Sequence, residues 1–195
     1  MVKTICVFCA SSSKVDEIYL NTARELADMC IEHQIHVLYG GGAFGLMGAL
    51  ADRILESEGK ISGIIPDFMK AMQWAHNNVS EMIVVEDLRE RKKRMIENVD
   101  AVVALPGGVG TLEELLEVIT LKQLGRFNKP IIIVNTEGFY NALIQLFDEM
   151  IEKHFMRDIH RQLWTVIESP SDLLHAINNA PDLDASVFNQ VAYAG

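Results

Sequence analysis

The sequence is short of positive charge and of long apolar runs. It holds 17 Lys and Arg against 27 Asp and Glu, a formal net charge of -10. This balance argues against a general affinity for nucleic acid or anionic membranes, because binding a polyanion requires a basic surface. No segment approaches the ~18 continuous apolar residues of a membrane span, and the opening run MVKTICVFCA is too short for a signal peptide. We therefore expect a cytoplasmic protein.

Cysteine is also scarce, with Cys6, Cys9 and Cys30 alone in 195 residues. Cys6 and Cys9 form a C-x-x-C, but they lie in an apolar run typical of a buried strand. Neither a second pair nor a Cys/His metal spacing follows. We interpret all three as inert core thiols and expect no metal site.

Length and a hydrophobic content of 49% predict one domain, over residues 1–182, with 183–195 as a C-terminal tail. Short apolar or β-branched runs predict strands, at 5–10, 35–40, 61–66, 82–87, 101–106, 131–135 and 164–168. Amphipathic stretches between them predict helices, near 16–33, 45–58, 88–99, 111–125, 138–154 and 171–179. Strict alternation predicts an α/β fold of three layers, with about seven mainly parallel strands and helices on both faces. The continuous apolar runs predict strands covered on both faces.

Ligands of such sheets bind beyond the carboxyl ends of the strands, so the loops after strands are the candidate sites. In the loop 10–13, the serine hydroxyls either bind a ligand or begin the next helix. Gly40, Gly42 and Gly45 match G-x-G-x-x-G, which raises a dinucleotide site. The match follows the second strand, however, and the next strand closes on Pro66 rather than on an acidic residue. Sharp turning and close helix packing are the favoured interpretation of these glycines.

The connection 67–80, DFMKAMQWAHNNVS, is long and irregular for a compact domain. Long loops of this kind are often pocket walls. His76 lies within it and is a weaker candidate for a ligand contact.

A third loop, LPGGVGTLEELLEV at 105–118, packs three glycines before an acidic helical pattern. Its glycines leave backbone N–H groups open, and a helix starting at Thr111 directs its positive dipole end to the same point. That arrangement suits an anion. Thr111 and Glu114 equally match a T-x-x-E capping box, in which Glu114 reaches back to the cap. The spacing alone leaves both interpretations open.

The basic run RERKKR at 89–94 favours the ligand site. Successive residues of a helix are rotated by ~100°. On that spacing Arg94 falls on the outer side, Lys92 lies within the apolar stripe and Arg91 borders it. Cations that face inward need an anion. Arg91 suits bidentate contacts with a phosphate or a planar base, whereas Lys92 is a point charge.

Three segments together carry a resemblance, namely YGGGAFGLMG at 39–48, RERKKRM at 89–95 and PGGVGTLEE at 106–114. With them the chain resembles the LOG (Lonely Guy) family of nucleoside 5'-monophosphate phosphoribohydrolases, from about residue 3 to 180. The resemblance implies a Rossmann-like fold, a homodimer with active sites at the subunit interface, and hydrolysis of the N-glycosidic bond of AMP-like nucleotides without a metal or redox cofactor. Family members often carry a lysine decarboxylase label, but that chemistry uses a pyridoxal Schiff-base lysine, and nothing here marks one out.

By position, the resemblance implies Arg91 and Glu114 as catalytic residues. The substrate-binding positions that it implies are Lys92, Gly107, Gly108, Val109, Gly110, Thr111, Glu113, Thr120, Gly41, Gly42 and Ser11. The chain departs from the family pattern at Leu88-Arg89, where relatives often read M-H, and at Ala43, where a serine is common. An acidic substrate contact of some members has no counterpart between Met69 and Ser80. The base is therefore left open.

We expect the hydrolysis of a purine ribonucleoside 5'-monophosphate, AMP or an N6-substituted cytokinin nucleotide, to ribose 5-phosphate and free base. Glu114 would bond the ribose and Arg91 would stabilise the departing base. We also expect Glu114 to cap its helix in the empty protein and to turn toward ribose when nucleotide binds. The alternatives are a non-catalytic nucleotide sensor and, less favoured, an NAD(P)-binding enzyme.

Overall fold

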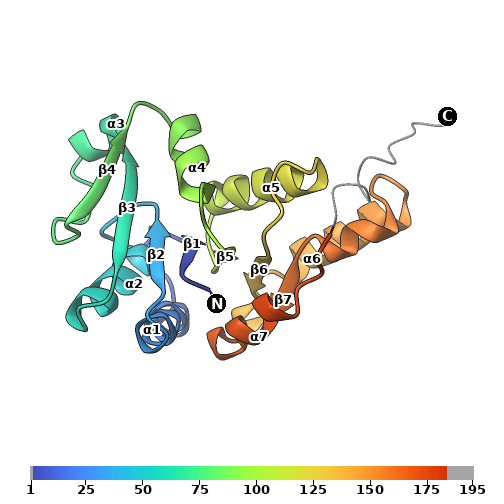
Figure 1. The fold of residues 1–195 in the computed structure, drawn as a ribbon, viewed down its shortest axis with the longest axis horizontal. Coiled ribbons are helices and arrows are strands. Elements are labelled where there is room, and N and C mark those ends of the chain that lie inside the picture. The colour runs from blue at the N-terminus through green and yellow to red at the C-terminus, as the bar shows by residue number, and fades with distance from the viewer. Residues whose placement is uncertain (1, 184–195) are drawn as a thin grey trace.

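The computed structural model describes residues 2–183, and the predicted tail beyond 183 lies outside the described residues. Within them the chain forms one seven-stranded sheet in the order β4-β3-β2-β1-β5-β6-β7, with every pair parallel (Figure 1). The strands are β1 (Thr4–Phe8), β2 (His36–Tyr39), β3 (Ile61–Pro66), β4 (Glu81–Val85), β5 (Ala101–Ala104), β6 (Ile131–Val134) and β7 (Thr165–Ile167). The α/β fold with a parallel sheet is confirmed.

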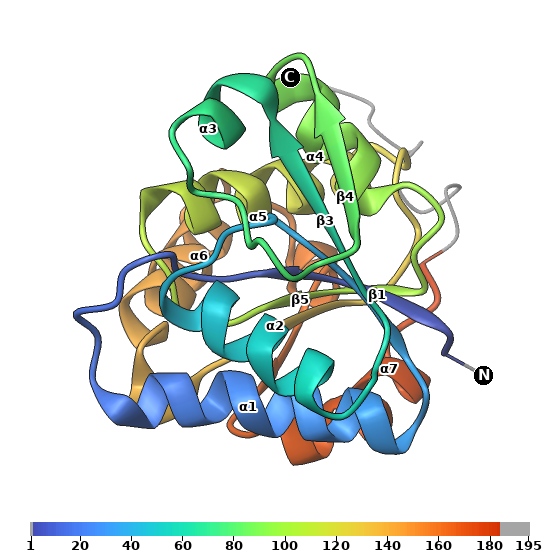
Figure 2. The same ribbon diagram turned by 90° about the vertical axis from the view of Figure 1, so that its left-hand side faces the viewer.

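Helices cover both faces of the sheet (Figure 2). One core cluster joins the strands to α1 (Glu17–Glu32), α2 (Gly45–Glu56) and α7 (Leu173–Asn178). The other joins them to α4 (Leu88–Ile96), α5 (Val109–Gln123) and α6 (Asn141–Glu152). The stretch 67–80, predicted as irregular, begins with the short helix α3 (Asp67–Ala71). No helix among the described residues is long and apolar enough to cross a membrane.

The apolar runs became strands because both of their faces are buried, and β5 and β6 contain only buried residues. The expectation of two covered faces is wrong for β4. This strand lies at the edge of the sheet and pairs with β3 alone, and Ile83 and Val84 are 36% and 41% exposed.

The three cysteines are buried, as expected of core thiols. Cys6 lies in the cluster under α4, α5 and α6, and Cys9 lies in the cluster on the opposite face. Burial raises the pKa of each thiol, so these groups stay protonated and unreactive.

The strand order reverses between β1 and β5, where a ligand site is expected in a doubly wound sheet. The loops after these strands meet at this point. The Ala10 N–H donates to the Pro106 carbonyl at 3.2 Å, and the Met47 N–H donates to the Ala10 carbonyl at 3.2 Å. The serine loop, the glycine loop after β2 and the start of α5 are therefore neighbours.

Candidate active site

A buried ion pair joins the two helices that begin at this edge of the sheet. Asp87 caps α4 by accepting from the N–H groups of Arg89 and Glu90, both at 2.8 Å. One turn later Arg91 points inward, and its Nη1 donates to Glu114 Oε1 of α5 at 2.7 Å. Its Nε donates to the Ile64 carbonyl of β3 at 3.1 Å. The side chains of Arg91 and Glu114 are 8% and 5% exposed, so the pair is almost fully removed from water.

The capping box predicted for Thr111 and Glu114 is wrong. Helix α5 begins at Val109 with Gly108 as its N-cap, two residues earlier than predicted, and no side chain caps it. Glu114 binds Arg91 instead, because a charged hydrogen bond to a buried guanidinium is stronger than one to a peptide N–H. Burial raises the pKa of the Glu114 carboxyl, and the charge of Arg91 opposes that rise.

Close packing explains why two positions of the G-x-G-x-x-G pattern are occupied by glycine. A Cβ on Gly40 would collide with Nη2 of Arg91, so this glycine makes room for the guanidinium. Gly45 has a φ of +61°, and a Cβ there would collide with the carbonyl of Ser12. The favoured interpretation of this loop, close approach and sharp turning, accounts for both positions.

The N-terminus of α5 is open to a ligand. A Cβ added to Gly108 or Gly110 meets nothing within 4 Å, and Val109 is 83% exposed. The first N–H groups of a helix have no intrahelical partner, and the helix dipole is positive there. Thr111, also in the first turn, is buried and packs against Gly107. This end of α5 can accept a phosphate through backbone N–H groups.

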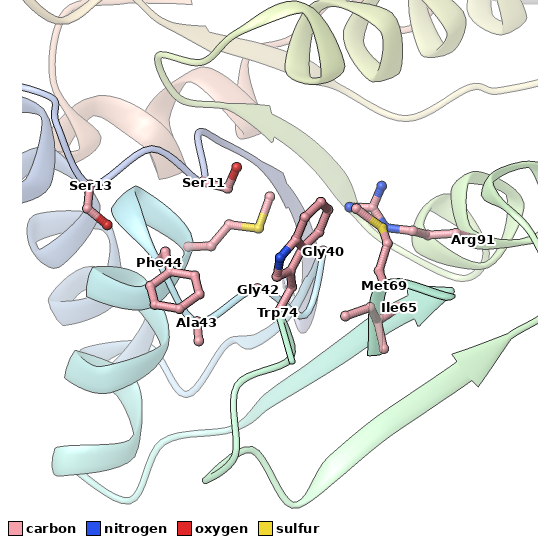
Figure 3. A pocket seen from close by; sticks show the side chains of 11 residues that line it. Ser11, Ser13, Gly40, Gly42, Ala43, Phe44, Ile65, Met69, Trp74 and Arg91 are labelled. Carbon is pink, nitrogen blue, oxygen red and sulfur yellow. The ribbon is translucent and has the colours of Figure 1, made fainter. Parts of the chain in front are cut away.

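A cavity of about 320 Å³ has Arg91 in its wall (Figure 3). Its size falls at the lower end of the range for small-molecule sites, about 300–1,000 Å³. Apolar side chains form most of the wall, and Arg91 is its one charged residue within the described chain. The lining residues are Ser11, Ser13, Gly40, Gly42, Ala43, Phe44, Met47, Ile65, Met69, Trp74 and Arg91.

Known proteins match this chain over most of its length. The model of a family described as "Possible lysine decarboxylase" matches residues 47–177. The Arabidopsis thaliana cytokinin riboside 5'-monophosphate phosphoribohydrolase LOG5 is 37% identical over 175 residues, 90% of this chain and 77% of that protein. Its LOG1 counterpart is 39% identical over 169 residues, 87% of this chain and 78% of that protein.

The chain belongs to the LOG family.

Solved structures of other proteins agree on the fold. The molybdenum cofactor carrier protein of Chlamydomonas reinhardtii matches with a TM-score of 0.68 and 20% identity, over 92% of this chain and 98% of that one. A molybdenum cofactor binding protein of Rippkaea orientalis matches equally well, at a TM-score of 0.68 and 19% identity, over 91% and 96%. At these identities the likeness concerns the fold alone.

Among the residues carried over from the LOG pattern, Ser11, Gly42 and Arg91 line the cavity, and Glu114 lies directly behind Arg91. Gly107 to Thr111 lead into α5, which begins at Val109, and none of them belongs to the described cavity wall. Gly41, which lies between the cavity residues Gly40 and Gly42, has a φ of +75° and turns the chain there.

Lys92 does not face the cavity. Its ammonium binds Glu113 and, at 2.5 Å, Glu117 of α5, and the hydrogen bonds that it donates to these carboxylates raise the pKa of the lysine. The helical spacing predicts Lys92 as the more inward cation, but Arg91 is the buried one. The reason is that α4 packs against an acidic row of α5 as well as against the sheet, so Lys92 already has its anions. Thr120 is exposed, and its hydroxyl donates to the Leu116 carbonyl of its own helix at 2.8 Å.

Several cavity residues were missed by sequence reasoning, notably Phe44, Met69 and Trp74. The available signal for Met69 and Trp74 was the length of the 67–80 connection, which predicted a pocket wall but not the side chains that form it. The serines of 11–13 do not begin α1, which starts at Glu17 with Asp16 as its N-cap. Among the described residues no group of three or more His, Cys, Asp and Glu side chains could hold a metal ion.

Proposed function

We propose that this LOG protein hydrolyses the N-glycosidic bond of a purine ribonucleoside 5'-monophosphate, AMP or an N6-substituted relative, to the free base and ribose 5-phosphate. The carrying observation is the order of the groups. Glu114 lies on α5, whose open N-terminus suits a phosphate, and it binds Arg91, which lines an apolar cavity that suits a base. Phosphate, ribose and base follow one another in the nucleotide in the same order. The names of the relatives, cytokinin riboside 5'-monophosphate phosphoribohydrolases, support the same reaction.

The reaction needs opposite charges on the two sides of the bond that breaks. Positive charge develops on the sugar and negative charge on the departing base. In our proposal the Glu114 carboxylate faces the ribose, where it stabilises the cationic sugar and orients water. The Arg91 guanidinium lines the cavity and donates to the leaving base. Because the pair is desolvated, both charges act at low dielectric, where such interactions are strongest.

We further propose a homodimer with shared active sites. Thr120, a predicted binding residue, lies on the exposed face of α5, away from the cavity of its own chain. Leu116 on the same helix and Leu124, its C-cap, are 41% and 64% exposed. A second subunit packed on this face would bury these leucines and bring Thr120 to its nucleotide. Sedimentation and activity measurements on Leu124→Glu test this. The variant should be monomeric and should hydrolyse nucleotide slowly, whereas an unchanged dimer would refute this interface.

Incubating the protein with AMP, GMP, CMP and N6-isopentenyl-AMP and resolving the products tests the reaction. We expect base release from the purine nucleotides and its loss in Glu114→Gln and Arg91→Ala. Glu149→Gln, which alters an exposed ion pair with Lys153 at 3.0 Å, is the matched control and should be unaffected. An undiminished rate in Glu114→Gln would refute the assignment.

Two other functions make different predictions for the same samples. A non-catalytic nucleotide sensor would gain thermal stability from AMP without forming any product. A lysine decarboxylase would need a lysine at a pyridoxal site, but none of the described residues that line the cavity is a lysine. The detection of cadaverine from lysine would favour that function instead.

A further inference from the structure

A short strap, residues 72–77, crosses the glycine loop after β2 and closes one side of the cavity. The Ala43 N–H donates to the Trp74 carbonyl at 3.0 Å, and the His76 N–H donates to the Gly41 carbonyl at 2.9 Å. Between these two bonds, Gly42 and Ala75 form an antiparallel bridge. The strap is therefore held by its backbone in a fixed register on the loop that also makes room for Arg91.

The side chain of His76 fixes the strap to a helix. It is 6% exposed, and its Nε2 lies 3.0 Å from Oδ1 of Asp52 on α2. The Asn78 N–H donates to its Nδ1 at 3.3 Å, so Nδ1 is an acceptor and Nε2 carries the proton that is donated to Asp52. Both ring nitrogens are thus used in holding the strap, and neither faces the cavity. The Asp52 side chain itself is 61% exposed.

Trp74 is the side chain that the strap delivers to the site. Figure 3 shows its ring beside Gly40 and Gly42, on the side of the cavity to which the Arg91 guanidinium points. Trp74 is 46% exposed, which is unusual for a side chain with so large an apolar surface. Two backbone hydrogen bonds and a buried histidine hold the segment that carries this ring, yet the ring is nearly half exposed, so part of its surface is free for a ligand.

The side chains of the cavity wall determine which kind of ligand can bind against the exposed surface of Trp74. Within the described lining, the polar side chains are Arg91, Ser11 and Ser13, and the remainder is apolar or glycine. In the proposed function Arg91 is engaged at the glycosidic bond. The far edge of the base then meets apolar surface, so it is recognised by stacking and shape rather than by hydrogen bonds.

We propose that Trp74 is the specificity-determining residue of the site, which contacts the purine ring and an apolar substituent on it, and that the His76–Asp52 hydrogen bond is the device that positions it. This inference rests on the proposed function, since it takes the cavity as the base end of the site. His76 and Asp52 are positioning residues, because they act on the substrate only through the strap.

The binding half of the proposal can be tested by fluorescence, because the chain has two tryptophans. Trp164 packs on Phe147 in the core, with ring centroids 4.5 Å apart, so Trp164→Phe leaves Trp74 as the reporter. In Trp164→Phe/Glu114→Gln, which should not turn over, AMP and N6-isopentenyl-AMP should change the Trp74 emission. Ribose 5-phosphate, which has no base, should compete with AMP and leave the emission unchanged. An emission change that is equal for ribose 5-phosphate and AMP, or absent for both nucleotides, would overturn the proposal.

Kinetics test the selectivity and the positioning device. In Trp74→Ala the ratio of kcat/KM for N6-isopentenyl-AMP over AMP should fall by about tenfold, the lower end of what a small change in an apolar pocket produces. Asp52→Ala should move the same ratio in the same direction, mainly through KM. His76→Gln keeps an N–H donor for Asp52 and should restore most of the ratio relative to His76→Ala.

Asp28→Ala is the matched control, since it breaks an exposed contact of α2 with α1, the 2.6 Å pair with Arg53, in which the strap takes no part. A merely structural role would lower activity on both nucleotides alike. A ratio unchanged in Trp74→Ala overturns the inference while base release by the wild type keeps the proposed function. If the wild type releases no base at all, the proposed function fails, and the emission titration with AMP still decides whether Trp74 contacts the purine.

Discussion

The replacement of Arg91 by methionine probes the ion pair on which the site depends. It keeps most of the side-chain volume and removes the guanidinium, which leaves the Glu114 carboxylate buried without its cation. The two side chains are 8% and 5% exposed, so water cannot replace the lost partner. Breaking a buried pair in this way costs about 3–5 kcal/mol. The hydrogen bond to the Ile64 carbonyl, lost as well, adds about 1 kcal/mol.

The loss of stability in Arg91→Met should be smaller at low pH than at high pH. Burial already holds the pKa of Glu114 above its usual value, and the charge of Arg91 opposes that rise. Without Arg91 the folded-state pKa rises further. A carboxyl whose folded pKa exceeds its unfolded pKa binds its proton more tightly in the folded state, so stability is regained as pH falls through the folded pKa toward about 4.3. The variant should therefore be closer to the wild type at pH 5 than at pH 8.

Urea denaturation of both proteins at pH 5 and pH 8 measures these differences. Arg94→Met is the control, because its pair with Glu90 is 3.7 Å long and both side chains are largely exposed. Such pairs contribute about 0–1 kcal/mol. A loss below about 1 kcal/mol in Arg91→Met at pH 8, or a loss that is equal at both pH values, would refute the reasoning, since the loss expected when a desolvated pair is broken is several-fold larger.

Three further substitutions follow from the structure. Gly108→Ala should lower the free energy of unfolding by no more than about 1 kcal/mol, because its Cβ meets nothing within 4 Å and alanine is only a poorer N-cap than glycine, yet raise KM for AMP by roughly tenfold if phosphate lies there; an unchanged KM would place the phosphate elsewhere. Gly40→Ala should lower kcat by about 100-fold with the fold intact, because its Cβ displaces the Arg91 guanidinium; full activity would contradict this. Burial lowers the pKa of Lys122 to about 8, so Lys122→Met should be more stable than the wild type at pH 7, by about 1–3 kcal/mol. This advantage should shrink between pH 8 and 10 as the folded wild type loses its buried charge, and a constant gap in calorimetry would refute it.

The sheet and its layers could be predicted from the sequence because they depend on local composition. Continuous apolar runs such as those that became β5 and β6 bury both faces, and the amphipathic stretches between them cover the sheet. The exposure of β4 could not be predicted in this way, since its sequence is as apolar as that of a central strand. Its place at the edge is decided by strand order, which is a long-range property.

The candidate site could be predicted only in part, because some of its contacts depend on long-range structure rather than on local sequence. The helical spacing predicted an inward-facing cation on α4 but favoured Lys92, whereas Arg91 is the buried one, and the open start of α5 follows from its glycines. The capping box was wrong because the sequence shows what Glu114 can reach along its own helix, whereas its actual partner lies 23 residues away. Trp74 was missed because nothing local marks it. Its place depends on a bridge between Gly42 and Ala75 and on the bond from His76 to Asp52. The cytoplasmic location stays a prediction.

Simultaneous measurement of adenine and ribose 5-phosphate after incubation with AMP tests the central claim most directly. Hydrolysis at the Arg91–Glu114 pair predicts that the two products appear in equal amounts, and that Glu114→Gln forms neither. Adenosine and phosphate as products would instead mean that a different bond is broken. The absence of any product, with AMP still bound, would contradict the account and leave a nucleotide sensor.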